Sequence, residues 1–135
     1  MQMHTQRMLE THPRRIGGNA AVLGAAVSAC YDCAQACTTC ADACLNEQNV
    51  TELARCIRLD IDCADVCELT GRVLSRVSNT EHRPFTSLVQ ACADVCRACA
   101  EECEKHHHHE HCRIRAEACR GCERACTDLA GGMVH

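Results

Sequence analysis

The cysteines of this 135-residue chain recur at alternating steps of three and four residues. In the segment CYDCAQACTTCADAC (residues 30–44) this spacing places the thiols on one face of a helix, because three to four residues complete one helical turn. Three later segments repeat the spacing, and in two of them Asp60 and Arg115 each take one position of the stripe. Steps that average about 3.5 residues are typical of helices packed side by side in a bundle. The sixteen cysteines are Cys30, Cys33, Cys37, Cys40, Cys44, Cys56, Cys63, Cys67, Cys92, Cys96, Cys99, Cys103, Cys112, Cys119, Cys122 and Cys126.

Turn signals separate the four stripes and predict four helices. The first is an alanine-rich run that follows two glycines and ends at the sequence NEQN (residues 46–49). The second begins near Val50, with Asn49 or Thr51 as the candidate N-terminal cap.

The connections before and after the third helix are also short. The sequence SNTEHRP (residues 78–84) ends the second helix, and its proline suits the first turn of the third. The histidine tract HHHHEH (residues 106–111) follows the third helix, and the fourth runs from about Glu110 to two glycines at residues 131–132. Because short connections favour antiparallel neighbours, the sequence predicts an all-α, up-down-up-down four-helix bundle with a cysteine-lined core. We expect residues 18–132 to form this bundle and residues 1–17 to form a short helix or a loose arm.

The two ends of the predicted bundle differ in character. At one end the histidine tract lies beside Cys44, Cys56, Cys103 and Cys112, which predicts an open mouth. At the other end the stripe positions are apolar and predict a hydrophobic plug. The predicted core is therefore a tube of thiols that is closed at one end and opens among histidines at the other. The plug residues are Leu23, Val27, Val73, Leu74, Val77, Phe85, Leu88, Val89, Leu129 and Met133.

Packing, disulfide bonding and metal binding are three interpretations of the cysteines. A free cysteine is often a small buried hydrophobe, but sixteen in register, in a chain with one Phe, one Tyr and no Trp, exceed what packing explains. Neighbours at i+3 or i+4 on a helix have Cβ atoms about 5–6 Å apart, whereas a disulfide needs about 3.8 Å. Disulfides between helices would also need an oxidising compartment. The stripe therefore favours metal binding.

Soft thiolates select Cu(I), Zn(II) or iron–sulfur clusters. Structural zinc needs four ligands converging on an isolated tetrahedral site, and iron–sulfur clusters are usually held by cysteines on loops. Cu(I) needs only two or three thiolates, and thiolates can bridge neighbouring copper ions. Multiple Cu(I) ions per chain fit the tube best, and an iron–sulfur electron-transfer protein is the alternative. Each Cu(I) would replace one thiol proton, so a tube of neutral thiols could fill without building up charge.

Other classes of protein find little support in the composition. The net charge of −4 and the pI near 6.1 indicate no basic surface for nucleic acid. No stretch approaches the roughly 20 apolar residues that span a membrane. No single cysteine stands in an electropositive setting that would activate it, so we expect no enzyme. The run at residues 14–30 superficially resembles an export signal, but cleavage before Cys30 would remove plug residues, so we expect the chain in the cytoplasm.

Four segments together resemble the cytosolic branch of the bacterial copper storage proteins. They are CYDCAQACTTCADACL, LARCIRLDIDCADVC, CADVCRACAEEC and HEHCRI, within roughly residues 20–130. The resemblance implies a four-helix bundle filled with Cu(I), assembled as a homotetramer, with the sixteen cysteines as copper ligands. It also implies a histidine-rich entrance at His106, His109 and His111, whose imidazoles would capture copper and pass it to thiolates. The chain departs from the family at Arg115, where relatives often have another cysteine, and Asp60 is a polar stripe residue placed to ligate copper or to gate the tube.

Overall fold

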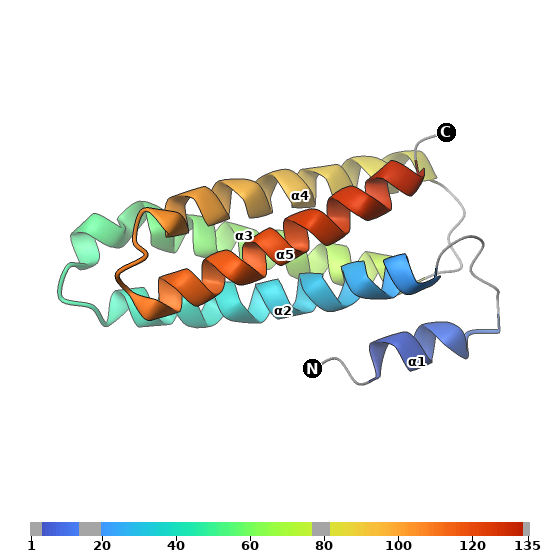
Figure 1. Ribbon diagram of the computed structural model, residues 1–135, viewed down its shortest axis with the longest axis horizontal. Helices are drawn as coiled ribbons and strands as arrows, with labels where there is room; N and C mark the ends of the chain where they lie inside the picture. The colour runs from blue at the N-terminus through green and yellow to red at the C-terminus, as the bar shows by residue number, and fades with distance from the viewer. Residues whose placement is uncertain (1–3, 14–19, 77–81, 134–135) are drawn as a thin grey trace.

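The computed structural model describes residues 4–13, 20–76 and 82–133, without the side chains of 82–84 (Figure 1). A short helix α1 (Thr5–Glu10) precedes four long helices, and a 3-10 turn η1 (Val50–Leu53) introduces the second of these. The long helices are α2 (Ala20–Leu45), α3 (Ala54–Leu74), α4 (His82–Glu104) and α5 (Glu110–Met133). The predicted all-α fold is confirmed.

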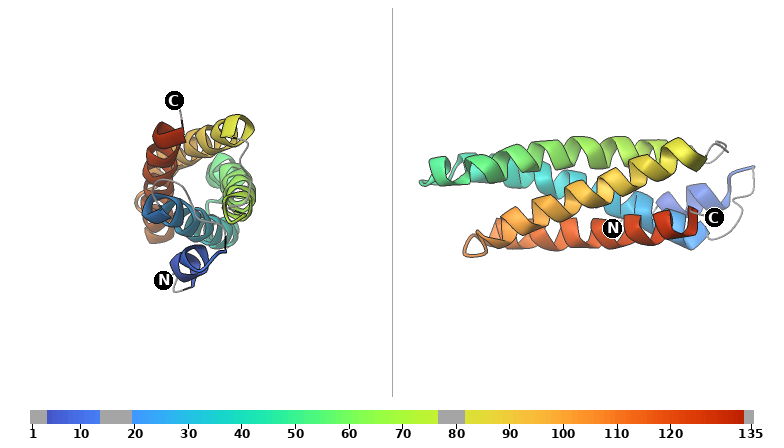
Figure 2. Two further views of the ribbon diagram at one scale, coloured as in Figure 1. Left: turned by 90° about the vertical axis from the view of Figure 1, so that its right-hand side faces the viewer. Right: turned by 90° about the horizontal axis from the view of Figure 1, so that it is seen from above.

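The four long helices run antiparallel in sequence order around one core. Figure 2 shows them from the end of the bundle, enclosing the centre, with α1 outside against α2. Neighbours in contact are α2 with α3, α3 with α4, α4 with α5 and α5 with α2, so the chain closes into a ring of helices. The up-down-up-down topology is therefore also as predicted.

Helix ends differ from the sequence-based prediction in two places. The helical run at Val50 begins as a 3-10 turn; Asn49 holds its N-cap position, as one of the two candidates predicted, but its side chain makes no capping hydrogen bond. The fourth helix continues through the glycines at residues 131–132 to Met133 instead of ending there. Pro84 is the third residue of α4, close to its predicted place in the first turn.

The sealed end of the bundle is the end where α2 begins and α3 ends. Val27, Leu74 and Val89 are buried there, and Leu23 and Met133 pack against them with partial exposure. Of the other predicted plug residues, Val77 lies outside the described residues, while the remaining four are partly exposed. These four are Val73, Phe85, Leu88 and Leu129. This end therefore has an apolar seal, built mainly from the three buried residues Val27, Leu74 and Val89.

Helix α2 is long and apolar enough to cross a membrane by length and composition alone, with a mean hydropathy of 1.3, contrary to expectation. Its cysteines and alanines raise this value, since both count as apolar on a hydropathy scale. In the structure each of its five cysteines is buried, as are Ala26, Ala34 and Ala41. Core helices of bundles pass the same test of length and composition.

Candidate metal centre

All sixteen cysteines are free and point into the core, where none is more than 2% exposed. The stripe spacing explains this, because α2, α3, α4 and α5 each turn their thiol face toward the bundle axis. Sulfur atoms from different helices meet at short range, for example Cys67 and Cys96 at 3.5 Å and Cys33 and Cys119 at 3.6 Å. These separations far exceed the S–S bond of about 2.05 Å in a disulfide. The core is lined by reduced thiols along its length.

Several sets of four donors already lie close enough to share one metal ion. In the set Cys67, Cys92, Cys96 and Cys122, all four sulfurs lie within 4.8 Å of one another. The set comes from α3, α4 and α5, so three helices contribute to one site. Cys67 and Cys96 also belong to a second set with Cys33 and Cys63. Overlapping sets of this kind suit a metal that accepts bridging thiolates better than one that needs isolated tetrahedral sites.

The cysteines fall into two groups along the bundle axis. The inner cluster packs together with the apolar seal. The outer cluster packs around Leu53 at the opposite end. The eleven cysteines of the inner cluster are Cys30, Cys33, Cys37, Cys63, Cys67, Cys92, Cys96, Cys99, Cys119, Cys122 and Cys126. The five of the outer cluster are Cys40, Cys44, Cys56, Cys103 and Cys112.

Hydrogen bonds among the thiols hold most of them protonated. Hydrogen bonding with Cys122, together with burial, raises the pKa of Cys30, Cys67 and Cys96 above the ordinary thiol range. In the outer cluster, the pKa of Cys56 is lowered instead of raised. A hydrogen bond from Cys103 and the nearby positive charge of Arg115 lower its pKa to about 7. Hydrogen bonds with neighbouring thiols also lower the pKa of Cys63, Cys92, Cys112, Cys119 and Cys122, so the expectation of neutral thiols throughout is not met at six of the sixteen positions.

His111 connects the outer cluster to the surface. Its Nδ1 lies 3.4 Å from Sγ of Cys40 and 3.7 Å from Sγ of Cys112. Cys44 completes a set of four donors within 4.8 Å of one another. On the other side of the ring, Nε2 lies 2.8 Å from a carboxylate oxygen of Glu47. The imidazole thus has one ring nitrogen turned toward the thiols and the other toward the carboxylate of Glu47.

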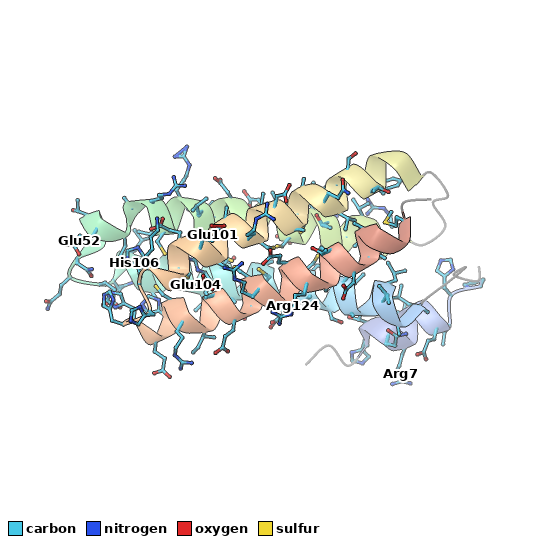
Figure 3. The ribbon with its side chains drawn as sticks, turned by 45° about the horizontal axis from the view of Figure 1, so that its top comes forward. Arg7, Glu52, Glu101, Glu104, His106 and Arg124 are labelled. Atoms are coloured by element: carbon cyan, nitrogen blue, oxygen red, sulfur yellow. The ribbon has the colours of Figure 1, made fainter. Side chains whose placement is uncertain are left out.

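The other two predicted entrance histidines lie at the same end but do not touch the thiols. His106 pairs with Glu102 at 2.9 Å, and Figure 3 shows it at the same end of the bundle as Glu52. His109 pairs through Nδ1 with Glu47 at 3.1 Å, and its buried Nε2 has no partner. His107 and His108 are exposed.

The carboxylates that orient these histidines were missed from the sequence. Glu102 on α4 precedes His106, which lies in the turn after that helix, by four residues, and this i, i+4 spacing could have indicated the pair from the sequence. Glu47 lies in the α2–η1 connection and meets His109, in the α4–α5 connection, and His111, at the start of α5, only because the bundle brings these segments together. Hydrogen bonding to His111 lowers the pKa of Glu47.

Asp60 and Arg115, the two polar residues of the stripe, are buried side by side. Their side chains are fully excluded from solvent and lie in direct contact between α3 and α5. Arg115 also donates hydrogen bonds to sulfurs of Cys56 and Cys99, at 3.1 Å and 2.6 Å. Both polar positions predicted from the stripe therefore lie in the core among the thiols, next to the outer cluster.

Comparison with known proteins identifies this arrangement. A family model described as copper storage protein matches residues 19–131. The chain belongs to the copper storage protein family. The family resemblance stated from its sequence motifs is confirmed.

Solved structures of copper storage proteins share the fold. The copper storage protein Ccsp from Streptomyces lividans, loaded with 10 copper equivalents, is 48% identical and superposes with a TM-score of 0.92, covering 95% of this chain and 98% of that one. A cytosolic copper storage protein from Streptomyces lividans with five coppers is 52% identical, with a TM-score of 0.81 over 82% of this chain and 93% of that one. The Cu(I)-bound copper storage protein BsCsp3 from Bacillus subtilis is 38% identical, with a TM-score of 0.72 over 81% and 98%. The iron–sulfur alternative finds no support among these relatives.

Proposed function

We propose that this copper storage protein holds many Cu(I) ions in the cytoplasm through its sixteen cysteine thiolates. Residues 18–132 form the copper-binding domain, and the protein has no catalytic role and no nucleic-acid or membrane partner. The proposed assembly is a homotetramer, as the sequence resemblance implies. Its cargo enters past the histidines and leaves by the same route.

The column of buried, reduced thiols carries this proposal. Sulfur atoms of neighbouring helices lie 3.5–4.0 Å apart along it, as between Cys67 and Cys96 and between Cys44 and Cys112. Cu(I) is a soft ion that two or three thiolates satisfy. Small inward shifts of side chains already in place would let adjacent sulfurs share copper ions. A single catalytic or redox centre would use only a few of these sulfurs and leave the rest unexplained.

Charge balance also favours storage. A bare thiolate core would be strongly repulsive, but each Cu(I) that binds displaces a proton of the same charge. The raised pKa of Cys67 and Cys96 keeps the empty core neutral at those positions until copper arrives. The column is therefore able to fill ion by ion.

The entrance is proposed at His111, with His106 and His109 beside it. Neutral imidazole is a common metal ligand, and His111 contacts both the outer thiols and the surface. A surface pocket between the two loops at this end is lined by residues 46–49, His108 and His109. Copper delivered to this pocket would meet the histidines before any cysteine.

Titration of the reduced protein with Cu(I) against a competing chelator tests the proposal. We expect more than about eight copper ions per chain, given shared thiolates. Saturation at one to three ions would contradict storage. Loaded protein should be essentially colourless, whereas a brown protein after aerobic purification would indicate an iron–sulfur cluster.

A further inference from the structure

Three thiols and one imidazole nitrogen meet at the histidine end of the bundle. Cys40 and Cys44 lie near the end of α2, and His111 and Cys112 lie at the start of α5. The three cysteines are at most 2% exposed, whereas the side chain of His111 is 26% exposed. The four donor atoms all lie within 4.8 Å of one another. They form a compact set that is buried on the thiol side and reaches solvent through the imidazole.

The distances within this set are those of a tetrahedral zinc site. The three sulfur–sulfur distances are 3.9, 4.0 and 4.0 Å. Nδ1 of His111 lies 3.4 Å from the sulfur of Cys40 and 3.7 Å from that of Cys112. With Zn–S bonds of about 2.3 Å and Zn–N bonds of about 2.05 Å, a tetrahedron has edges of about 3.8 Å between sulfurs and about 3.5 Å between sulfur and nitrogen. The five distances therefore agree with a zinc site to within about 0.3 Å.

The mixture of donors also favours Zn(II) at this position over the sets made of cysteine alone. Three thiolates and one imidazole are a common ligand set of structural zinc. With a neutral imidazole the complex carries one negative charge, whereas four thiolates around Zn(II) carry two. Because an uncompensated charge is costly to bury, the mixed set suits a divalent ion better than the fully buried all-cysteine sets do. One such set is Cys67, Cys92, Cys96 and Cys122.

Glu47 supports His111 in the way that zinc-binding histidines are usually supported. Oε2 of Glu47 lies 2.8 Å from Nε2 of His111, on the side of the ring away from the thiols. A histidine that binds zinc almost always donates its other ring N–H to a carboxylate, a carbonyl or water, which fixes the ring and raises its basicity. This hydrogen bond places the proton on Nε2 and leaves the lone pair of Nδ1 directed at the sulfurs. The backbone N–H of Glu47 also donates to the carbonyl of Cys44 at 3.2 Å, which ties the carboxylate to the same site.

We propose that Cys40, Cys44, Cys112 and Nδ1 of His111 form a site for one Zn(II) ion, with Glu47 as its orienting carboxylate. Binding releases the protons of the three thiols and joins the end of α2 to the start of α5. Zinc thus closes the histidine end of the copper-free bundle. Cu(I) is softer and prefers thiolates more strongly, so copper loading expels the zinc ion. Only this last step rests on the proposed function; the zinc site itself rests on the donor geometry.

Titration of the reduced, copper-free protein with Zn(II) against a chromophoric chelator tests the site. Wild-type protein should bind one zinc ion per chain more tightly than any further ion. His111→Ala and Cys112→Ser each remove a ligand and should weaken this binding by more than about 100-fold. Glu47→Ala removes only the orienting carboxylate and should weaken it by about 10–100-fold, as losses of such partners do.

Two matched variants control for general effects on the core and on the histidine tract. Cys96→Ser removes a thiol that belongs to two all-cysteine sets, and His107→Ala removes an exposed histidine of the same tract. Both should bind the first zinc ion as tightly as the wild-type protein. Circular dichroism of each variant checks that the bundle is folded, so that a loss of zinc reports on the site.

Co(II) is a spectroscopic probe of the same site, because tetrahedral Co(II) with thiolate ligands absorbs strongly in the visible range. One equivalent should give this spectrum in the wild-type protein, and His111→Ala should change or abolish it. Adding Cu(I) to the zinc-loaded protein should release one zinc ion per chain to a fluorescent zinc indicator. Zinc that stays bound after copper saturation would overturn the displacement step.

Absence of a tight first zinc ion in the wild-type protein would overturn the zinc site. Zinc affinity that is unchanged in both His111→Ala and Cys112→Ser would do the same, because the ion would then be held elsewhere. Failure of the storage proposal is distinct, since it would appear as a low capacity for Cu(I). A normal copper capacity without a zinc site therefore rejects this inference alone.

Discussion

Arg115 on α5 donates a hydrogen bond to Oδ1 of Asp60 on α3, and neither side chain is exposed to solvent. Each residue replaces a cysteine in the stripe of its helix, and the bundle brings the two replacements to the same level of the core. Removing either partner alone would leave a buried charge or polar group without compensation, which is more damaging than removing both. The two departures from the cysteine pattern are therefore one structural feature.

The first prediction concerns the pH dependence of stability that Asp60 causes. Burial raises the pKa of Asp60 to about 8, although Arg115 beside it acts in the opposite direction. In the unfolded chain an aspartate has a pKa of about 3.9. The folded state therefore holds a proton that the unfolded state loses, so this contribution to stability is complete below about pH 4 and is lost as pH rises toward 8.

Urea denaturation of the reduced, copper-free protein between about pH 4.5 and 7 measures this contribution. Relative to Asp60→Asn, the free energy of unfolding of the wild-type protein should fall by up to about 1.4 kcal/mol per pH unit. The asparagine variant carries every other titrating group, so the difference isolates Asp60. Parallel curves for the two proteins would show that Asp60 is already ionised in the folded state.

The second prediction is that the copper-free protein is folded. Buried thiols pack as small hydrophobes, and the empty core already has close sulfur contacts such as Cys33 with Cys119 at 3.6 Å. Far-ultraviolet circular dichroism of the reduced apo protein should therefore show a helical spectrum that changes little on loading. Thermal unfolding should shift upward with copper, because a ligand that binds only the native state stabilises it. A random-coil spectrum without copper would mean that metal drives folding, as in zinc fingers.

The third prediction concerns the apolar seal. Leu74 is 8% exposed and packs in the inner cluster, whereas Leu69 on the same helix is 53% exposed. Leu74→Ala should lower the free energy of unfolding of the apo protein by about 2–4 kcal/mol, through lost burial and the cavity left behind. Leu69→Ala is the matched control and should change it by less than about 0.5 kcal/mol. Equal effects of the two substitutions in urea denaturation would place the seal elsewhere.

The helices and their topology followed from the sequence because thiols at steps of three and four can share one core only in a bundle. The inward direction of all sixteen cysteines followed for the same reason. The spacing of the cysteines could not indicate contacts between residues far apart in the sequence. Glu47 meets His111 across 64 positions of the chain, and no local pattern specifies that distance. The pairing of Asp60 with Arg115 was likewise hidden, since each appeared separately as an interruption of its own stripe.

The end of α5 was also misjudged from the sequence. Two consecutive glycines favour a helix end in isolation, yet α5 continues through them to Met133. Met133 packs against the inner cluster, and Ala130 before the glycines is buried. Tertiary packing of these flanking residues outweighs the intrinsic preference of glycine, which costs only about 1 kcal/mol per residue in a helix.

The last prediction separates the entrance from the store. His111 reaches Cys40 at 3.4 Å, while His106 and His109 are held by Glu102 and Glu47. Replacing His106, His109 and His111 together with alanine should slow copper loading and removal, since copper then has no imidazole to receive it at the surface. Total capacity should stay nearly the same, because the thiolates hold almost all of the metal.

Single variants refine this expectation. His111→Ala should account for most of the slowing, because His111 alone of the three contacts the outer thiols. His107→Ala is the control, since His107 is exposed and bonds only to a backbone oxygen of its own turn. Loading is followed by Cu(I)–thiolate absorbance after mixing, and capacity by chelator competition. A triple variant that loads at the wild-type rate but loses most of its capacity would make the histidines storage ligands and place the entrance elsewhere.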